Sequence, residues 1–380
     1  MRDDVWMKNV SVVIIGGGAT GTGIARLAAE SGYSVTLIEQ GSMASGTTGH
    51  FHGMLHSGAR YAVNDTSVAA ACFLENQRLS TIIPDVIRKT GGLFLAMNDE
   101  EASHGDALEN ACRAAGIPIE EISVETARKH EPYVSNAVKR AFIVPDGTID
   151  GMALVTLNRK AAESAEIPAR FITNHRVERF SFDNNMISSV HVQDKKTGEN
   201  KTISCDVVIN ATGVWTGVIT ALAGISLEMM YDKGTMIVFD APLSSAVLNR
   251  CRPEFDGDLL VPLDGHSIMG TTTRVVESPD DNIPTQEEVD VLVREGGVMV
   301  PSMQDADALR VYAGIRPLQK PLTIDTETVH HSTRDVSRGF QILDHTSKGV
   351  NNFISVTGGK VTLYRLMSEK VVDVLNERYA

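Results

Sequence analysis

Side chains that could do chemistry are concentrated in one short segment, GHFHGMLHSGARYA, which covers residues 49–62. The candidates in it are His50, His52, His56, Arg60 and Tyr61. Three histidines at this spacing could hold a metal ion, but the segment is rich in glycine and has no nearby aspartate or glutamate, so no metal site is predicted. A hydrolytic triad is not expected, because there is no G-x-S-x-G motif and no serine set up beside a base. The role of the segment therefore depends on what surrounds it.

A second group of cations lies near the end of the chain. It comprises Arg316 in YAGIRPL, Arg334 in STRDVSRG and Lys360 in TGGK. Arg316 is expected to follow a strand and to precede a proline that ends it. Guanidinium groups bind carboxylate or phosphate with two parallel hydrogen bonds. Because the chain carries a net charge of -13, converging cations indicate a small anionic substrate, whereas nucleic acid is not expected as a partner.

A glycine motif near the start of the chain predicts a dinucleotide site. Gly16, Gly18 and Gly21 have the G-x-G-x-x-G spacing. In this motif the first glycine permits a tight turn, the second lets a diphosphate approach the backbone, and the third allows close packing of helix on strand. The diphosphate would then lie on the unpaired N–H groups at the helix N-terminus.

The elements around this motif are those of a βαβ unit. The sequence predicts a strand over Val10 to Ile15, an amphipathic helix over about Ala19 to Glu30 and a second strand over Ser34 to Ile38. Glu39 ends the second strand, where its carboxylate can accept both ribose hydroxyls of an adenosine. The loop QGSMASGTTGHFHG follows where a nicotinamide-binding domain would usually start its next helix. This small-residue loop favours an extended FAD.

Two distant segments are expected to complete the cofactor lobe. One is a strand over Asp206 to Asn210 that leads into a turn ending at Gly213. The other is a strand over Phe353 to Val356, followed by the turn Thr357-Gly358-Gly359 and a helix that begins near Lys360. The N-terminal amides of that helix could hold a negative flavin ring or diphosphate.

The remaining segments predict a second lobe, and 380 residues are enough for two. Alternating or turn-bounded runs indicate strands at RVERFSF, ISSVHVQD, KTISC, GTMIVFD, DLLVPLD and HSIMGTTT, and a helix at TQEEVDVLVREGGVM. We infer a largely antiparallel sheet with helices on one side that roofs the flavin. The predicted domains are a discontinuous FAD-binding domain over residues 1–90, 140–225 and 335–380, and a substrate-binding cap over residues 91–139 and 226–334.

Compartment and thiol chemistry follow from simpler features of the chain. No apolar run reaches the roughly 18 residues needed to span a bilayer. The chain enters its first strand without the regions of a secretory signal, so a cytoplasmic protein is expected. The four scattered cysteines, without C-x-x-C spacing, are predicted to be buried thiols.

Seven motifs occur in the order found in one enzyme family. They are IIGGGATGTGIA, GTTGHFHGMLHSGARY, VPDGTID, VVINATGVW, GTTT, AGIRPL and VTGGKVTLYRLM. Nearly the whole chain resembles the FAD-dependent glycerol-3-phosphate dehydrogenases, in particular the catalytic A subunit of the anaerobic bacterial enzyme. The resemblance implies an α/β fold, with a Rossmann-like FAD-binding domain of the D-amino-acid-oxidase type and an interleaved antiparallel-sheet substrate domain. It also implies oxidation of sn-glycerol 3-phosphate to dihydroxyacetone phosphate by hydride transfer to FAD, with the electrons passed to a quinone or a partner acceptor.

The resemblance also assigns residues. Arg60, Tyr61 and His56 are expected near the substrate, Arg316 and Arg334 on its phosphate, and Lys360 between flavin and substrate. The residues expected to contact FAD are Gly16, Gly18, Ala19, Thr20, Gly21, Glu39, Gln40, Thr47, Thr48, His52, Val177, Gly213, Gly358, Gly359, Lys360, Val361 and Thr362.

Two departures from the family leave alternatives open. Where the aerobic branch places a histidine after a Lys-Gly pair, this chain has Thr235-Met236 after Lys233-Gly234, so His56, Tyr61 or a bound water could be the base. The family's catalytic chain in the anaerobic enzyme continues into a cysteine-rich electron-transfer domain that this sequence does not contain, which fits either a shortened chain or a stand-alone relative with another acceptor.

The alternatives for function are of two kinds. One is an FAD-dependent oxidase or dehydrogenase of another small anionic substrate, such as a 2-hydroxy acid, another polyol phosphate or an amino acid. The other is a flavoprotein subunit that is inactive without electron-transfer or membrane-anchor partners. Such partners would place it peripherally at the inner face of the plasma membrane.

Overall fold

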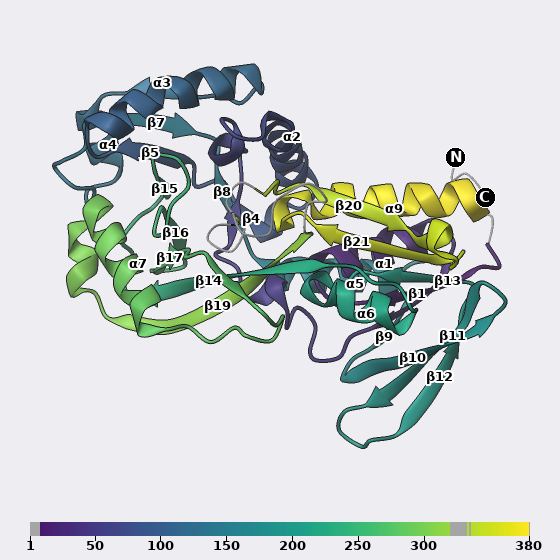
Figure 1. The fold of residues 1–380 in the computed structure, drawn as a ribbon. Coiled ribbons are helices and arrows are strands. Elements are labelled where there is room, and N and C mark those ends of the chain that lie inside the picture. Colours follow the sequence, from purple (N-terminus) through teal and green to yellow (C-terminus); the bar gives the residue numbers. More distant parts are fainter. Residues whose placement is uncertain (1–7, 320–332, 334–335, 380) are drawn as a thin grey trace.

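Two sheets of unequal size organise the two lobes of the computed structural model, which describes residues 8–319, 333 and 336–379 (Figure 1). The first lobe has a six-stranded sheet in the order β20-β21-β13-β1-β2-β9. Its strands are β1 (Ser11–Ile15), β2 (Ser34–Ile38), β9 (Arg170–Ile172), β13 (Val207–Asn210), β20 (Phe340–Asp344) and β21 (Phe353–Gly358). All neighbours are parallel except β20, which runs antiparallel to β21. Segments far apart in the sequence, from β1 to β21, thus contribute strands to one sheet.

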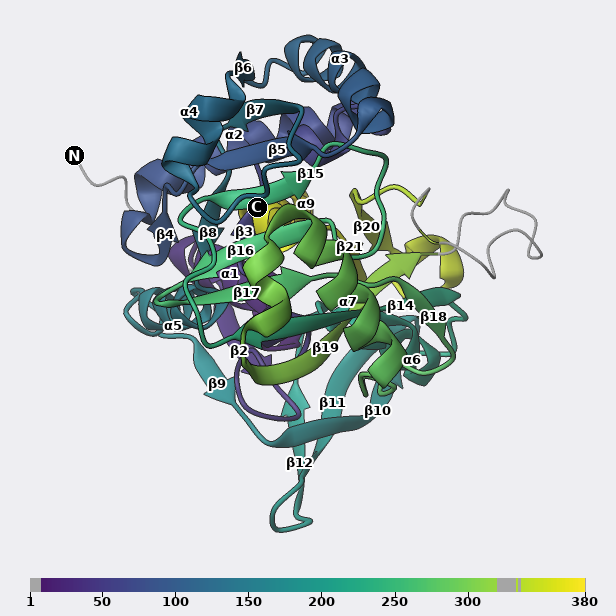
Figure 2. The same ribbon diagram turned by 90° about the vertical axis from the view of Figure 1, so that its left-hand side faces the viewer.

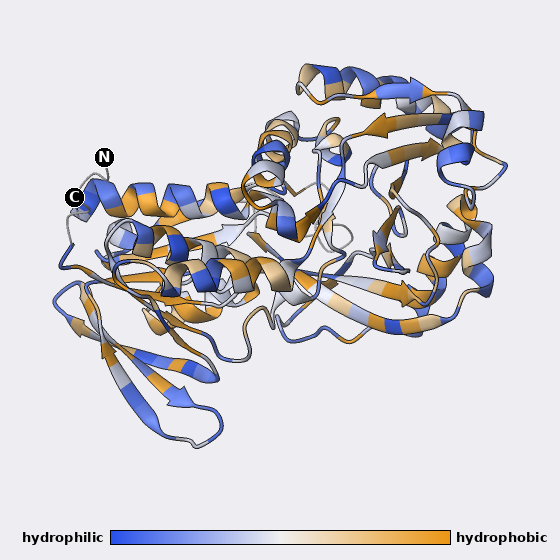
Figure 3. Cartoon of the chain, turned by 180° about the vertical axis from the view of Figure 1, so that it is seen from behind, coloured by the Kyte–Doolittle hydropathy of each residue, from blue (hydrophilic) through white to orange (hydrophobic). Residues whose placement is uncertain are grey.

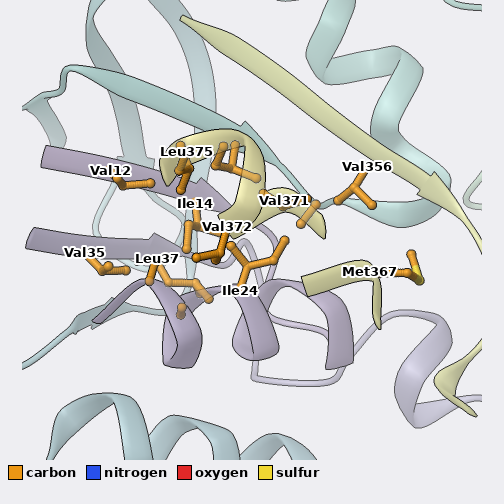
Figure 4. Packing of buried hydrophobic residues seen from close by; sticks show 14 of the residues in the cluster. Val12, Ile14, Ile24, Val35, Leu37, Val356, Met367, Val371, Val372 and Leu375 are labelled. Atoms are coloured by element: carbon orange, nitrogen blue, oxygen red, sulfur yellow. The ribbon is translucent and has the colours of Figure 1, made fainter. Parts of the chain in front are cut away.

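Side chains alternate along the strands of this sheet, so the sheet has two faces to bury. Helices cover one of them. The helices on this face are α1 (Ala19–Glu30), α5 (Gly151–Glu163) and α9 (Tyr364–Tyr379), whereas Ile219 of α6 (Thr216–Leu222) packs with Val13 on the other face. Val12 and Ile14 of β1 pack against Ile24 of α1 and against Val371 and Leu375 of α9 (Figure 4). The bounds of β2 and α1 are those that the sequence predicted.

The opposite face of the same sheet carries a small antiparallel sheet. This sheet consists of β10 (His175–Asp183), β11 (Met186–Asp194) and β12 (Asn200–Ser204). Val13 and Ile15 pack against Val177 of β10 and Val190 of β11. Figure 3 shows hydrophilic residues over much of the rest of the small sheet. These three strands were predicted correctly, but their placement in the roof over the flavin was wrong, since an alternating pattern does not specify which sheet a strand joins.

The second lobe contains a nine-stranded sheet, in the order β18-β14-β17-β16-β15-β5-β7-β6 with β19 paired to β14. Its strands are β5 (Gly92–Ala96), β6 (Glu120–Ile122), β7 (Arg140–Val144), β14 (Met229–Phe239), β15 (Val247–Arg250), β16 (Leu259–Leu263), β17 (His266–Gly270), β18 (Arg274–Val276) and β19 (Ala308–Gln319). Every pairing is antiparallel except that of β15 with β5. Because β7 belongs to this sheet, residues 140–144 lie in the second lobe rather than in the cofactor lobe where we predicted them.

The helices in the described part of the second lobe are α3 (Asp99–Ala114), α4 (Val124–His130) and α7 (Gln286–Met299) (Figure 2). Leu292 and Met299 of α7 pack on Ile237 of β14 and Met269 of β17. The antiparallel sheet with helices that the sequence predicted for this lobe is therefore confirmed.

The remaining described elements are short, apart from α2. They are α2 (Thr66–Ile82), the small sheet of β3 (Met54–Leu55), β4 (Ile87–Arg88) and β8 (Gly147–Ile149), and the 3-10 turns η1 (Thr47–Gly49), η2 (Ala59–Tyr61), η3 (Pro84–Val86), η4 (Gly213–Trp215), η5 (Pro301–Asp305), η6 (His345–Lys348) and η7 (Val361–Leu363). The histidine-rich segment therefore spans η1, β3 and η2.

Two local predictions need correction. Arg316 lies inside β19, which continues through Pro317 to Gln319, so the proline does not end the strand. In the described part of the chain β19 pairs only with β14, and an edge strand tolerates a residue that lacks an N–H donor. The last helix, α9, begins at Tyr364, because η7 intervenes after Lys360.

The cysteines and the hydropathy of the helices agree with the sequence analysis. Cys72, Cys112, Cys205 and Cys251 are buried free thiols, as predicted. Among the described residues, no helix combines the length and the apolar character needed to cross a bilayer.

Candidate active site

The glycine turn between β1 and α1 brings three backbone segments into close contact. Gly16 has φ +114°, and a Cβ added to it would lie 2.5 Å from the carbonyl oxygen of Ala211. A Cβ on Gly21 would lie 1.9 Å from the carbonyl oxygen of Gly16. Only glycine fits at these two positions. The turn therefore brings the N-terminus of α1 against the end of β13.

The N-terminus of α1 offers donors to a ligand. Gly18 is the N-cap and supplies no side-chain acceptor. The amide of Ala19 donates to Thr48 Oγ1 at 3.0 Å, which ties the small-residue loop to the helix. The other N–H groups of the first turn have no partner within the helix, and such a terminus attracts anions.

Glu39, at the end of β2, lies beside the glycine turn. Its two carboxylate oxygens accept the amides of Gly17 and Gly41, each at 2.7 Å. A carboxylate has about four acceptor positions, so each oxygen can also accept a hydroxyl. Glu39 thus holds the glycine turn and can still bind a ribose.

A first cavity, with about 1250 Å³ of empty space including open solvent, runs along this turn. Fourteen of the residues predicted to contact FAD line it: Gly16, Gly18, Ala19, Thr20, Glu39, Gln40, Thr47, Thr48, Val177, Gly213, Gly358, Gly359, Lys360 and Val361. The other three lie elsewhere. Gly21 packs behind the turn, His52 lines a second cavity, and buried Thr362 accepts the amide of His56 at 3.1 Å.

Sequence reasoning did not assign Trp215, His175 and Arg176, which also line this cavity. The indole Nε1 of Trp215 donates to Asp280 Oδ1 at 3.1 Å. Trp215 was within the quoted motif VVINATGVW, but nothing in the spacing separates a wall residue from a core residue.

A second cavity, with about 1120 Å³ of empty space including open solvent, adjoins the first. The two share the lining residues Thr47, Pro317, Gly359, Lys360 and Val361. Of the residues predicted to be catalytic, five lie on this second wall: His56, Arg60, Tyr61, Arg316 and Lys360. Arg334 lies outside the described residues. The histidine-rich segment and the C-terminal turn, distant in sequence, therefore meet at one cavity.

The imidazoles of His52 and His56, on the wall of this cavity, are neutral near pH 7. Desolvation, with smaller contributions from Arg316 and Arg60, lowers the pKa of His52 to about 3. Desolvation and the neighbouring His52, Lys360 and Arg60 lower the pKa of His56 well below its ordinary value. His52 Nδ1 accepts the amide of Met54 at 3.1 Å, so its proton is on Nε2. Among the described residues, Nδ1 of His56 has no hydrogen-bond partner.

Lys360 and Tyr61 meet where the two cavities join. The Lys360 Nζ lies 3.8 Å from the centre of the Tyr61 ring and donates to the carbonyl oxygen of Arg338 at 3.2 Å. Desolvation lowers the pKa of Lys360. Desolvation, with a smaller contribution from Glu254, raises the pKa of Tyr61, so the phenol stays protonated.

Two arginines, Arg316 and Arg338, line the second cavity and lie beside the same carboxylate. Arg316 Nη1 donates to Asp232 Oδ2 at 2.8 Å, and Nη1 of Arg338 lies 3.6 Å from the same oxygen. We did not predict Arg338, although it follows Arg334 by four residues in the quoted segment STRDVSRG. The spacing alone did not indicate that Arg338 lies near Asp232 of β14.

Arg60 reaches the cavity from η2 and is held by two polar side chains. Its Nη1 donates to Asn249 Oδ1 at 3.2 Å, and Nη2 lies 3.8 Å from Asp258 Oδ2. Desolvation raises the pKa of Asp258 to about 6, against the opposing effects of Arg60 and Arg252. Within the described part of the chain, no group of three or more His, Cys, Asp or Glu side chains could hold a metal ion.

The sequence of this chain is similar to those of known proteins over most of its length. The sequence model of a family described as FAD dependent oxidoreductase (DAO) matches residues 11–360. The chain is 39% identical over 381 residues to the A1 subunit of the anaerobic glycerol-3-phosphate dehydrogenase of Haloferax volcanii, with 98% of this chain and 64% of that protein covered. It is 41% identical over 371 residues to the A subunit of the anaerobic glycerol-3-phosphate dehydrogenase of Escherichia coli strain K12, with 97% of this chain and 67% of that protein covered. The chain spans about two thirds of the length of these relatives.

A solved structure shares the fold. The dithionite-reduced L-α-glycerophosphate oxidase of Mycoplasma pneumoniae, with FAD bound, superposes with a TM-score of 0.74 at 20% identity. The match covers 97% of this chain and 94% of that one. The two-lobed fold of this chain therefore also occurs in a solved structure.

Proposed function

This chain belongs to the FAD-dependent oxidoreductase family, in its glycerol-3-phosphate dehydrogenase branch, and from this premise we propose that it oxidises sn-glycerol 3-phosphate to dihydroxyacetone phosphate. The observation that carries the proposal is the continuity of the two cavities. A cleft shaped by a glycine turn opens, at Lys360, into a pocket lined by Arg316 and Arg338.

The cofactor is FAD, and the first cavity fits it. The uncapped N-terminus of α1 would hold the diphosphate, and Glu39 the adenosine ribose. A side chain at Gly16 would collide with Ala211, so the approach of the cofactor to the backbone there depends on glycine. FAD bound in this cavity supplies, at N5, the acceptor for the hydride that leaves C2 of the substrate.

The anionic end of the substrate is assigned to the two arginines. Arg316 and Arg338 present guanidinium groups to the second cavity, and planar guanidinium groups bind phosphate oxygens in pairs. Among the described residues, Nη1 of Arg338 makes no hydrogen bond, so a phosphate oxygen would satisfy it. Arg60, fixed by Asn249, lies on the wall of the same cavity, and a role for Arg334 stays a prediction.

The proton of the C2 hydroxyl needs an acceptor, and His56 is the best supported of the candidates. Tyr61 keeps its own proton, and His52 uses Nδ1 to accept a backbone amide. His56 is neutral and lines the cavity, and its buried Nδ1 has no hydrogen-bond partner in the described part of the chain. A bound phosphate would offset the positive charges of Arg60 and Lys360, which raises the pKa of the imidazole toward the range where it can take a proton.

The remaining assignments concern organisation and partners. The domain division into FAD-binding and cap segments is proposed with the bounds predicted above, apart from residues 140–144. The two dehydrogenase relatives named above carry the designations A and A1 within their enzymes, which supports a protein that passes its electrons to partner subunits or a quinone. A cytoplasmic or membrane-peripheral location follows from that assignment.

The test is a reduction assay on the purified, FAD-loaded protein. Anaerobic addition of glycerol 3-phosphate should bleach the flavin absorbance, and a dye acceptor should sustain turnover, whereas glycerol, which lacks the phosphate, should do neither at the same concentration. An intact yellow protein that glycerol 3-phosphate does not bleach would refute the substrate. A panel of 2-hydroxy acids and amino acids, with peroxide release measured in air, would then identify the alternative.

A further inference from the structure

Asp232 is a carboxylate buried behind the arginines of the second cavity. It lies on β14 and is 0% exposed. One of its oxygens, Oδ2, accepts from Arg316 Nη1 at 2.8 Å and lies 3.6 Å from Arg338 Nη1. A buried carboxylate without such partners would be strongly unfavourable. The three groups therefore form a unit in which one carboxylate faces both guanidinium groups.

Arg316 is the more firmly held of the two arginines. Besides Asp232, its Nη2 donates to Thr271 Oγ1 at 2.5 Å and to the carbonyl oxygen of Thr272 at 3.1 Å. Three acceptors therefore fix the plane of one guanidinium group, although the side chain remains 26% exposed to the cavity.

Gly234 leaves the space that this guanidinium occupies. A Cβ added to Gly234 would lie 2.5 Å from Arg316 Nη2 and 3.0 Å from its Cζ. Because side chains alternate along a strand, Asp232 and Gly234 share the face of β14 that meets Arg316. Lys233, between them, turns away and donates to the carbonyl oxygen of Ile283 at 2.8 Å.

We propose that Asp232 and Gly234 are positioning residues, which hold the Arg316 guanidinium in the cavity wall in the orientation that receives the anionic group of the substrate. The proposal rests on the assignment of that group to Arg316 and Arg338. A guanidinium that is already fixed loses little conformational freedom when the ligand binds, so the ligand binds more tightly than it would to a mobile arginine. The sequence YDKGT, which carries both residues, thus sets affinity for the anion rather than the rate of the chemical step.

A competing effect has the opposite sign. Asp232 is negative and lies close to the anion subsite, so its charge alone would oppose a phosphate. If repulsion dominated, removing the carboxylate would tighten binding. If positioning dominates, as we infer, removing it weakens binding. The direction of the change in KM therefore decides between the two.

The experiment compares Asp232→Ala, Asp232→Asn and Gly234→Ala with the FAD-loaded wild-type protein. Loss of a charge-assisted contact predicts that Asp232→Ala raises KM for glycerol 3-phosphate by about tenfold or more, with kcat and FAD content unchanged. Asp232→Asn keeps an acceptor for Arg316 Nη1 and should give a smaller rise. Gly234→Ala displaces the end of a flexible side chain, so it should raise KM without preventing folding.

The matched control is Glu75→Gln. Glu75 is also a buried carboxylate, and it accepts two hydrogen bonds from Arg365 at 2.7 and 2.8 Å, but it lies on neither cavity. The KM of Glu75→Gln for glycerol 3-phosphate should stay at the wild-type value. Unchanged or lower KM in both Asp232→Ala and Gly234→Ala would overturn the proposal, as would a loss of FAD that matches the change in KM.

A second measurement separates this inference from the substrate assignment. Calorimetric titration with inorganic phosphate reports the anion subsite without turnover, and the dissociation constant should rise in the same order as KM. If the wild-type protein binds phosphate but does not oxidise glycerol 3-phosphate, the proposed function fails and the titration still decides the role of Asp232. Absence of binding of both phosphate and glycerol 3-phosphate to the wild-type protein would overturn both.

Discussion

The Lys360 ammonium lies 3.8 Å above the centre of the Tyr61 ring, at the junction of the cofactor cavity and the substrate cavity. In the proposed reaction, a cation at this junction is close to the C2 hydroxyl oxygen, on which negative charge develops as its proton is removed. Fixed charges of this kind stabilise transition states more than ground states.

Lys360→Met is therefore expected to lower kcat for glycerol 3-phosphate by about 10²-fold, a typical effect of removing such a group. Steady-state kinetics with a dye acceptor measures it. Lys348→Met, at an exposed position, serves as the control and should leave kcat unchanged. A kcat for Lys360→Met equal to that of the control would remove Lys360 from the reaction centre.

Arg338→Ala should act on KM rather than on kcat. Loss of a charge-assisted contact to phosphate predicts a rise in KM of about tenfold to hundredfold, with FAD content preserved. Arg316→Ala should behave alike, and the double variant should show less than the product of the two effects, because both arginines contact Asp232 and the same anion. Arg113→Ala, an exposed arginine of α3, is the control. Independent, multiplicative effects would contradict a shared anion site.

Glu39→Ala should weaken FAD retention. The variant loses both the acceptor for the Gly17 amide and the acceptor for the Gly41 amide, so the glycine turn loosens along with the ribose site. Glu39→Gln keeps one acceptor oxygen and should retain an intermediate amount of flavin. The ratio of flavin to protein absorbance after gel filtration measures retention, and Glu30→Ala at the end of α1 is the control. A fully loaded Glu39→Ala protein would count against this role.

The stability of the protein should fall in mild acid partly through His52. Its pKa in the folded protein is about 3, below the ordinary value of 6.5 that applies to the unfolded chain. Between these values the unfolded chain binds a proton that the folded chain does not, so the free energy of unfolding falls as the pH is lowered from 6.5 toward 3. The slope is at most about 1.4 kcal/mol per pH unit for one proton.

Denaturant unfolding at several pH values measures this slope. His52→Asn should show a shallower fall than the wild type over that window. His130→Asn, at an exposed position on α4, should leave the slope unchanged. Identical slopes for His52→Asn and the wild type would show that the imidazole is not excluded from protonation in the folded state.

Local patterns predicted the cofactor lobe well, because each of its features depends on neighbouring residues. The hydrophobic period defines α1 and β2, and Gly16 and Gly21 are at positions where any side chain collides with backbone. The same reasoning failed where the outcome depends on a distant partner. Pro317 stays within a strand because that strand lies at an edge of the sheet, which no local pattern reveals.

In the second cavity, too, residues in local motifs were predicted and residues that depend on distant partners were not. Arg316 was found from a short motif, but Arg338 and Asp232 were missed because their roles exist only after distant segments of the chain converge. In the sequence, nothing distinguishes Asp232 from an exposed charged residue beside a lysine. Its partners can be recognised only from the antiparallel register that sets Asp232 opposite Arg316.

The order of strands in the six-stranded sheet has a consequence for synthesis on the ribosome. β1 (Ser11–Ile15) is synthesised well before its neighbour β13 (Val207–Asn210), and β21 (Phe353–Gly358) and α9 (Tyr364–Tyr379) follow later still. The apolar side chains of Ile14 and Ile24 therefore stay uncovered by α9 until residues 364–379 have been synthesised. A nascent chain of this protein should depend on chaperones until α9 has formed, and only then should it become competent to take up its flavin.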